Sequence, residues 1–120
     1  MTTSNTCVWF EIPVTDLERA RTFYSALMGR DLETRNGGPN PIVALTGMDD
    51  DGVSGHLYPG TPAAAGSGPT IHLAAPDGLD TAAARIRENG GTVVSDPIEI
   101  PAGTFFYATD PDGNSIGLFA

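Results

Sequence analysis

The order of apolar and polar positions predicts the same succession of elements in each half of the chain. In the first half, apolar and polar side chains alternate over residues 7–14, which predicts a strand. Ile12 and Val14 share one face of this strand, and we expect that face to pack on helices. Trp9 and Glu11 lie on the opposite face, which is predicted to line a pocket.

A helix is predicted directly after this strand. Thr15 and Glu18 have the spacing of a capping box, in which each side chain accepts a hydrogen bond from a free backbone N–H group. Gly29 is the residue type that ends helices in the left-handed conformation. The apolar positions between them recur at helical spacing and form one stripe: Leu17, Ala20, Tyr24, Leu27 and Met28.

Three further strands are predicted in the first half, at residues 30–35, 42–47 and 53–58. The last two flank an acidic turn at residues 48–52, and this arrangement predicts a hairpin. Residues 59–68 show no periodicity and are rich in Gly, Pro and Ala, so we expect a connector between the two halves.

The second half repeats this order. Residues 69–75 are predicted to form a strand, followed by a helix that starts near Asp77 or Asp80 and ends at Gly90 and Gly91. The apolar stripe of this helix is Leu79, Ala82, Ala83 and Ile86. The remaining strands are predicted at 92–95 (with an extension to 100 left open), 104–109 and 115–119. A Pro and Gly turn at 110–114 links the last two.

The two halves match at an offset of about sixty residues. Trp9 corresponds to Ile71 and Gly29 to Gly91, both 62 residues apart (71 − 9 and 91 − 29). Such self-similarity predicts one α+β domain of two βαβββ modules, which form a half-barrel with a central cavity. The predicted boundaries are about 6–58 for the first module, 59–68 for the linker and 69–120 for the second module.

The acidic composition narrows the function classes. The net charge is −9, and the chain has no lysine, since all six basic residues are arginine. This excludes a lysine Schiff base and argues against nucleic acid as a partner, because such binding needs basic side chains that neutralise phosphates. No apolar run has the length of a membrane span, and the N-terminal residues show no secretory pattern. With Cys7 as the single cysteine, we expect a cytoplasmic protein without a disulfide or a membrane partner.

Two stretches carry a resemblance to a known family. They are FEIPVTDLERARTFYSALMGRDL, at residues 10–32, and FFYATDPDGNSIGLF, at residues 105–119. Together with the element order, they resemble the vicinal oxygen chelate superfamily, which includes glyoxalase I, the extradiol dioxygenases and the fosfomycin- and bleomycin-resistance proteins. The resemblance implies the glyoxalase-like fold and commonly a homodimer, but the scaffold hosts many reactions and does not specify one.

Enzymes of that superfamily hold a divalent metal on side chains from the first and last strand of each module. On this sequence the resemblance places the four ligand positions at Trp9, His56, Ile71 and Gly117. Of these residue types, histidine alone is a metal ligand, so we expect no metal centre and no other cofactor. One alternative stays open: a one-residue shift would turn His72 inward, where it would complete a set with His56 and Glu11. The offset itself predicts that His72 faces the helices.

Ten residues are predicted to face the cavity: Trp9, Glu11, Ser54, His56, Tyr58, Leu73, Phe105, Tyr107, Gly117 and Phe119. Aromatic walls with one carboxylate suit flat or cationic organic ligands, through stacking and cation–π contacts. The other interpretation is that the large rings fill the space as ordinary core. No residue is assigned a catalytic role, although Glu11 and His56 are the candidates for a general base pair.

The leading hypothesis is therefore a glyoxalase- and bleomycin-resistance-like protein that binds an aromatic or cationic small molecule without a metal. A second hypothesis is a lyase, isomerase or dioxygenase with an altered divalent-metal site. A third is a non-catalytic association module. Whether the chain is an enzyme, and which ligand it takes, are not specified by any residue pattern.

Overall fold

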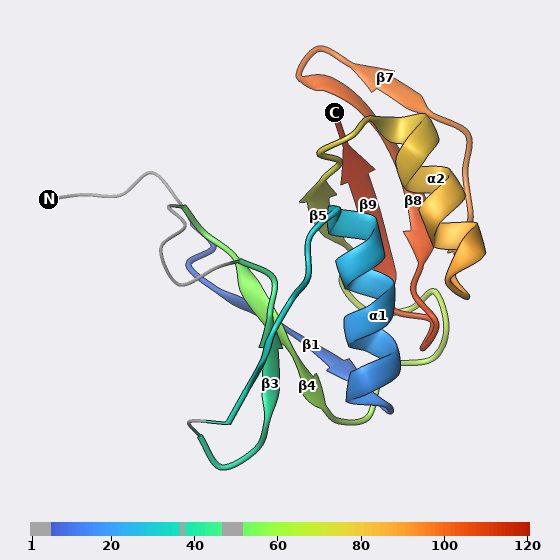
Figure 1. Ribbon diagram of the computed structural model, residues 1–120. Helices are drawn as coiled ribbons and strands as arrows, with labels where there is room; N and C mark the ends of the chain where they lie inside the picture. Colours follow the sequence, from blue (N-terminus) through green and yellow to red (C-terminus); the bar gives the residue numbers. More distant parts are fainter. Residues whose placement is uncertain (1–5, 37, 47–51) are drawn as a thin grey trace, which may run out of the picture.

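The computed structural model describes residues 6–36, 38–46 and 52–120. Its elements follow the order β1 (Phe10–Val14), α1 (Leu17–Met28), β2 (Thr34–Arg35), β3 (Ile42–Ala44), β4 (Gly55–Pro59), β5 (Ile71–Ala74), α2 (Leu79–Glu88), β6 (Thr92–Val93), β7 (Ile98–Ile100), β8 (Gly103–Thr109) and β9 (Ser115–Phe119). Figure 1 shows the two strand-and-helix units one after the other, which confirms the predicted α+β class. The predicted turn at 48–52 lies outside the described residues, apart from Gly52.

The strands form two separate sheets with the same internal plan. The first has the order β1-β4-β3-β2, and the second has the order β5-β9-β8-β6, with β7 also paired to β8. In each sheet the first strand of the module runs parallel to its last strand, β1 with β4 and β5 with β9. The repeat seen in the sequence is therefore a repeat of topology.

The second module has one more strand than predicted. The stretch after α2 is divided into β6 and β7, both paired with β8. Between them the backbone N–H groups of Val94 and Ser95 both donate to the carbonyl of Tyr107. Two residues of this stretch therefore lie opposite a single residue of β8. Such a bulge bends the strand, and Pro97 then lacks the N–H that would continue the ladder.

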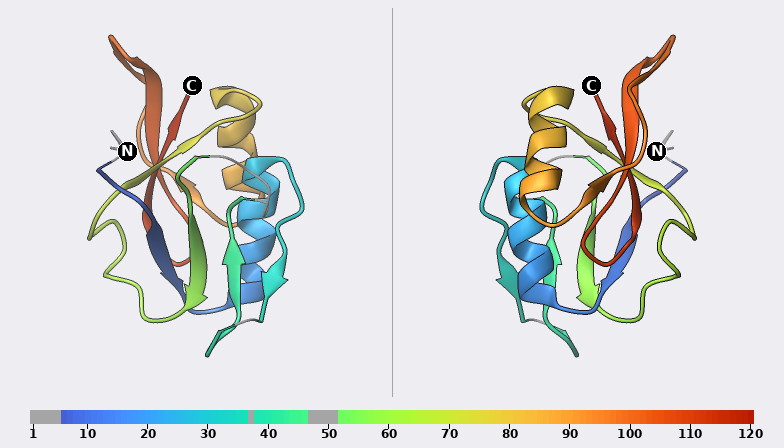
Figure 2. Two further views of the ribbon diagram at one scale, coloured as in Figure 1. Left: turned by 90° about the vertical axis from the view of Figure 1, so that its left-hand side faces the viewer. Right: turned by 90° about the vertical axis from the view of Figure 1, so that its right-hand side faces the viewer.

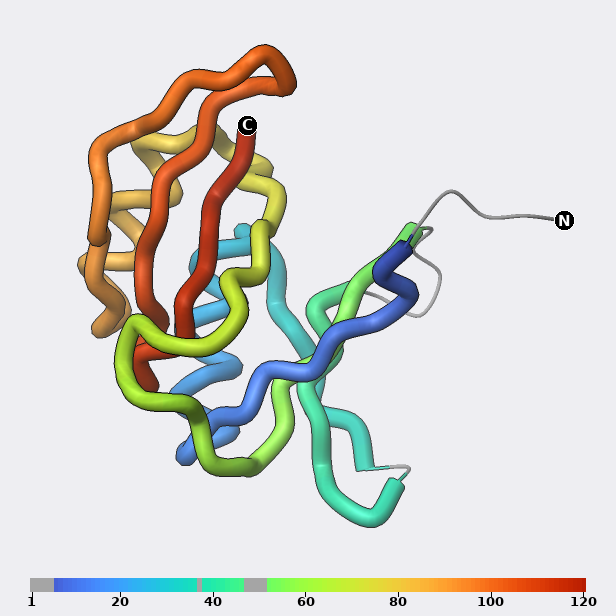
Figure 3. The backbone as a smooth tube through the Cα atoms, turned by 180° about the vertical axis from the view of Figure 1, so that it is seen from behind, coloured from blue at the N-terminus to red at the C-terminus, as the bar shows by residue number. Residues whose placement is uncertain are grey.

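Both helices lie on one side of the pair of sheets (Figure 2). Seen from behind, the sheets lie in front of the helices and diverge from the end where β1 meets the second sheet (Figure 3). The two sheets therefore stay open and form no closed barrel. No helix among the described residues is long and apolar enough to span a membrane.

The core fills the space between the helices and the inner faces of the sheets. The predicted stripes are confirmed, with Phe23 as a further buried residue of α1. Gly29 ends α1 in the left-handed conformation, with φ of 68°. The predicted N-cap is wrong, because Asp16 caps α1 by accepting a hydrogen bond from the Arg19 N–H. Thr15 is instead hydrogen-bonded to Asp112 of the second module.

That contact is part of a polar dock between the modules, which we define as residues 110–114 of the β8–β9 turn and the groups they bind. Asp110 is buried and accepts a hydrogen bond of 2.8 Å from the Tyr24 hydroxyl. Asp112 forms an ion pair of 2.8 Å with Arg19. Asn114 donates to the carbonyl of Pro13 at 2.8 Å. The dock fixes the end of β1 beside the second sheet.

Candidate functional site

The face of the first sheet that points away from the helices carries a connected polar and aromatic group. The parallel register of β1 and β4 pairs Glu11 with His56. The Trp9 indole Nε1–H donates to His56 Nδ1 at 2.9 Å, and His56 Nε2 lies 3.1 Å from a Glu11 carboxylate oxygen. The ring of Tyr58 stands edge-on to the imidazole, at a centroid distance of 6.2 Å. We call Trp9, Glu11, His56 and Tyr58 the first-sheet cluster.

The direction of these hydrogen bonds assigns the tautomer of His56. An indole nitrogen can only donate, so Nδ1 of His56 must accept and carries no hydrogen. The imidazole hydrogen is then on Nε2, from which it is donated to Glu11. In this arrangement His56 is the Nε2–H tautomer, and the Glu11 side chain that accepts its hydrogen bond is 62% exposed.

A second group of rings lies on the corresponding face of the second sheet. The rings of Phe105 and Tyr107 pack edge to face at 5.3 Å, and Phe105 stacks on Phe119 at 6.0 Å. His72 contacts both Phe105 and Tyr107, at 5.3 and 5.9 Å. We call these four residues, with Gly117, the second-sheet cluster. The predicted cavity residues are thus divided between two sheets.

The prediction for His72 is wrong. The structure pairs His72 with Gly117 across β5 and β9, as it pairs Glu11 with His56 across β1 and β4. A Cβ at position 117 would overlap the imidazole, so the glycine leaves the space that His72 occupies. The strands of the two modules are therefore offset by 61 residues (72 − 11 and 117 − 56), although the helices are offset by 62.

One extra residue explains this difference. Val14 is the last buried position of β1, and two residues separate it from α1. Its counterpart in the second module is Ala75, and three residues separate Ala75 from α2. Because strand faces alternate residue by residue, the longer connection places the other face of β5 toward the helices. Ile71 thus packs against the core and His72 points away from it.

Leu73 also lies elsewhere than predicted, whereas the placement of Ser54 on the cavity face stays a prediction. Leu73 is buried in the core between β5 and the helices, on the face opposite to His72. Ser54 is 7% exposed and precedes β4, where its carbonyl accepts from the Phe10 N–H. Leu73 faces the core for the same reason that His72 faces away from it: the connection before α2 is one residue longer.

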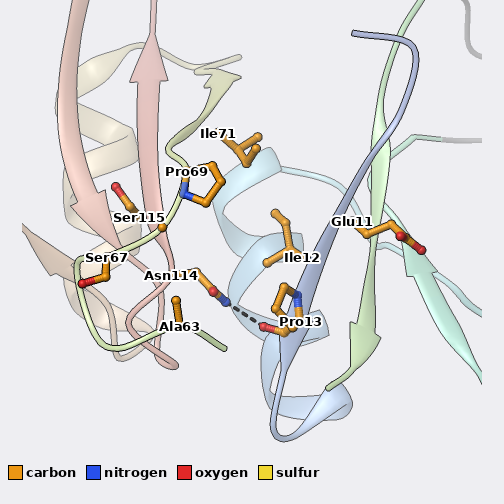
Figure 4. A pocket seen from close by; sticks show the side chains of 10 residues that line it. Glu11, Ile12, Pro13, Ala63, Ser67, Pro69, Ile71, Asn114 and Ser115 are labelled. Atoms are coloured by element: carbon orange, nitrogen blue, oxygen red, sulfur yellow. Dashed lines mark hydrogen bonds between the residues drawn. The ribbon is translucent and has the colours of Figure 1, made fainter. Parts of the chain in front are cut away.

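Two of the cavities follow the first sheet and its edge. One, of about 440 Å³, is lined by Glu11, His56 and Tyr58, by Arg35 and Ile42 from β2 and β3, and by Gly38, Pro39 and Asn40 between those two strands. A smaller one, of about 110 Å³, lies between the edges of β1 and β5 (Figure 4). There Asn114 reaches across to Pro13, while Glu11 points toward the first sheet (Figure 4).

A divalent metal would need about three protein ligands. Across residues 6–36, 38–46 and 52–120, no three His, Cys, Asp or Glu side chains gather where one ion could contact them. Glu11 and His56 are neighbours, but both nitrogens of His56 are already hydrogen-bonded. His72 lies on the second sheet, among aromatic rings. This arrangement does not fit a three-ligand metal centre.

The repeated topology and its open faces agree with a comparison to protein families. Residues 6–118 match the model of the Glyoxalase/Bleomycin resistance protein/Dioxygenase superfamily. The chain belongs to this superfamily. A comparison with curated proteins found no match.

Solved structures of the superfamily are similar over almost the whole chain. A glyoxalase/bleomycin resistance protein from Albidiferax ferrireducens T118 is 27% identical, with a TM-score of 0.70, covering 96% of this chain and 98% of that one. TnmS3, an antibiotic binding protein from Streptomyces sp. CB03234, is 26% identical, with a TM-score of 0.62, covering 99% and 98%. The fosfomycin resistance protein FosX from Mesorhizobium loti shares the fold, at 18% identity and a TM-score of 0.67, covering 99% and 93%.

Sequence reasoning missed five residues of the larger cavity: Arg35, Gly38, Pro39, Asn40 and Ile42. Arg35 lines it from β2 and Ile42 from β3. The pattern placed both in strands but could not show which face each would present, because these strands have only two and three residues. Arg35 was nevertheless noticeable as a charged residue in a predicted strand.

Proposed function

We propose that this superfamily member binds a small aromatic or cationic organic molecule on the open faces of its sheets, and that binding needs no metal ion. The observation that carries the proposal is the first-sheet cluster, where an exposed carboxylate lies beside three rings at the edge of a cavity of about 440 Å³. The similarity to the antibiotic binding protein TnmS3 supports a binding role.

The chemistry of the cluster favours a flat cation over a neutral molecule. A cation on the face of a tryptophan or tyrosine ring gains about 0.5–2 kcal/mol, depending on how far water is excluded. The Glu11 carboxylate adds an opposite charge at the same place. The net charge of −9 also raises the rate at which cations meet the surface.

The alternative of an association module with a filled pocket is less well supported, because the cavity beside the first-sheet cluster is open. We keep the expectation of a homodimer as part of the proposal. Val8 and Trp9 are exposed just before β1, at the free edge of the first sheet, and a second subunit would cover such an edge. Light scattering coupled to gel filtration measures this state.

Trp9 makes the binding test direct, since it is the single tryptophan of the chain. Protein treated with EDTA is titrated with N-methylquinolinium, a flat cation, and with quinoline, its neutral counterpart at pH 8. Calorimetry and Trp9 fluorescence are both recorded. We expect saturable binding in which the cation is about fivefold tighter, and a change in Trp9 emission.

Matched variants locate the site. Glu11→Gln should remove the preference for the cation, whereas Glu99→Gln, the same change at an exposed position of β7, should leave it intact. Failure of a broad panel of aromatic and cationic compounds to bind would refute the proposal. Stoichiometric metal in gently purified protein, lost in His56→Ala, would instead support a metal-dependent enzyme.

A further inference from the structure

The cavity of about 440 Å³ has charges of opposite sign at its two ends. The strands line it with Glu11 from β1, His56 and Tyr58 from β4, Ile42 from β3 and Arg35 from β2, and the β2–β3 connection adds Gly38, Pro39 and Asn40. These strands lie in the order β1-β4-β3-β2, so Glu11 and Arg35 come from opposite edges of the sheet. Three strand spacings separate the two backbones by about 14 Å.

The positive end has hydrogen-bonding capacity to spare. Arg19, Arg21 and Arg85 each form an ion pair with a carboxylate. Arg35 makes one hydrogen bond, from Nη2 to the carbonyl of Thr46 at 3.2 Å, and no ion pair among the described residues. A guanidinium has five N–H donors in a planar fork, so most of those of Arg35 remain for a ligand.

The negative end is similarly available. His56 donates a single hydrogen bond, which occupies one oxygen of Glu11. The carboxylate is 62% exposed, and its second oxygen has no hydrogen bond to a described residue. Trp9 contributes here by occupying Nδ1 of His56, which keeps the imidazole hydrogen on the nitrogen that faces Glu11.

Between the two ends the lining carries no charged side chain and includes the apolar Ile42 and the ring of Tyr58, with Gly38, Pro39 and Asn40 from the β2–β3 connection. Ile42 lies one strand from Arg35 and is its partner in the β2–β3 register. The Tyr58 ring is partly exposed on β4, between the two charged edges. A molecule that places one charge at each end would cross this middle section with an uncharged body.

Resting on the proposed binding function, we infer that the natural ligand is dipolar, with a cationic nitrogen held by Glu11 and a carboxylate held by Arg35. An apolar or aromatic body separates the two charges. An α-amino acid without a further charge does not fit, because its ammonium and carboxylate groups are attached to one carbon and cannot reach both ends. Arg35 and Glu11 are thus specificity-determining residues at opposite ends of one site.

Three related probes test this by calorimetry on the full chain: 4-(aminomethyl)benzoate carries both charges, its methyl ester only the cation, and 4-methylbenzoate only the anion. We expect the dipolar probe to bind about tenfold tighter than either singly charged probe. Arg35→Gln should remove this advantage and leave the affinity for the methyl ester unchanged. Glu11→Gln should weaken the methyl ester and leave 4-methylbenzoate unaffected.

Arg87→Gln, which removes the same charge from an exposed position of α2, is the matched control and should bind all three probes as the native protein does. Circular dichroism confirms that each variant is folded. Equal binding of the dipolar probe to the native protein and Arg35→Gln would overturn the inference, as would no binding of any of the three probes. If N-methylquinolinium still binds in either case, the proposed binding function stands and only the dipolar ligand is excluded.

Discussion

The buried contact between Tyr24 and Asp110 offers a quantitative test of how the two modules are joined. Asp110 is 3% exposed and has no ion pair with a basic side chain of the described residues; its carboxylate is stabilised by hydrogen bonds from Tyr24, Asn114 and the backbone of the turn. Tyr24→Phe keeps the ring in the core and removes one of these donors. The carboxylate then stays buried with one hydrogen bond fewer.

A hydrogen bond to a charged group contributes about 1.5–3 kcal/mol, so we expect the free energy of unfolding to fall by about 2 kcal/mol. For 120 residues the entropy of unfolding is about 0.25 kcal/mol/K, and the melting temperature should drop by about 8 °C. Urea unfolding followed by circular dichroism measures the first value and calorimetry the second. Tyr107→Phe is the control, because that hydroxyl makes no hydrogen bond within the described residues.

The same pair predicts a dependence on alkaline pH. Burial, followed by the charge of Asp110 and the hydrogen bond to it, raises the pKa of the Tyr24 hydroxyl well above its ordinary value. The folded protein therefore keeps a proton that the unfolded chain loses above about pH 10. The stabilisation is complete below that pH and falls as pH rises, by up to about 1.4 kcal/mol per pH unit.

The Tyr24→Phe variant lacks the hydroxyl that causes this pH dependence. Its free energy of unfolding should therefore fall less steeply between pH 10 and 11 than that of the native protein. A loss below 0.5 kcal/mol at neutral pH, or an alkaline slope equal to that of the native protein, would show that the hydroxyl does not stabilise Asp110. The Tyr24 hydroxyl would then contribute nothing to the dock, even if the modules were still joined.

Three further substitutions test the packing of the two sheets. Gly55→Ala places a Cβ against the Phe10 carbonyl oxygen, and because backbone cannot yield easily, we expect a loss of about 2–3 kcal/mol in urea unfolding. Gly117→Ala places a Cβ against the His72 imidazole, which can rotate away, so we expect a loss near 1 kcal/mol and a changed NMR signal of that histidine. Ile86→Ala removes a fully buried side chain of α2, and its midpoint of unfolding should reflect a loss of about 2–5 kcal/mol.

Each of these three predictions can be contradicted by a specific result. If Gly55→Ala costs less than Gly117→Ala, then β1 and β4 approach less closely than the structure indicates. An unchanged His72 signal in Gly117→Ala would mean that the imidazole does not lie over position 117. For Ile86, Ile98→Ala on the exposed β7 is the control, and an equal loss in both variants would contradict the assigned core.

Periodicity alone determined which faces of β1, α1 and α2 are buried. Ile12, Val14 and the two helical stripes pack in the core as predicted, because the spacing of side chains along one element is a local property. The turn after β8 was also predictable, since Pro111 and Gly113 carry their own backbone preferences. The charge and the missing lysine follow from composition and need no fold.

Periodicity did not determine which face of β5 packs against the helices. The sequence match rests on helix positions such as Leu17 and Leu79, but the connection before α2 is one residue longer than the one before α1. A single residue inverts the faces of a strand, so the helix offset assigned Leu73 to the cavity and His72 to the core. The pairing of His72 with Gly117 corrects both assignments.

The sites depend still more on tertiary structure. Trp9 and His56 are 47 residues apart, and their hydrogen bond exists because β1 pairs with β4 in one particular register. Glu11 and Arg35 lie on opposite edges of one cavity only through the strand order of the first sheet. Spacing along the chain encodes which residues share the face of one element, whereas distances between elements are set by how the strands pair and pack.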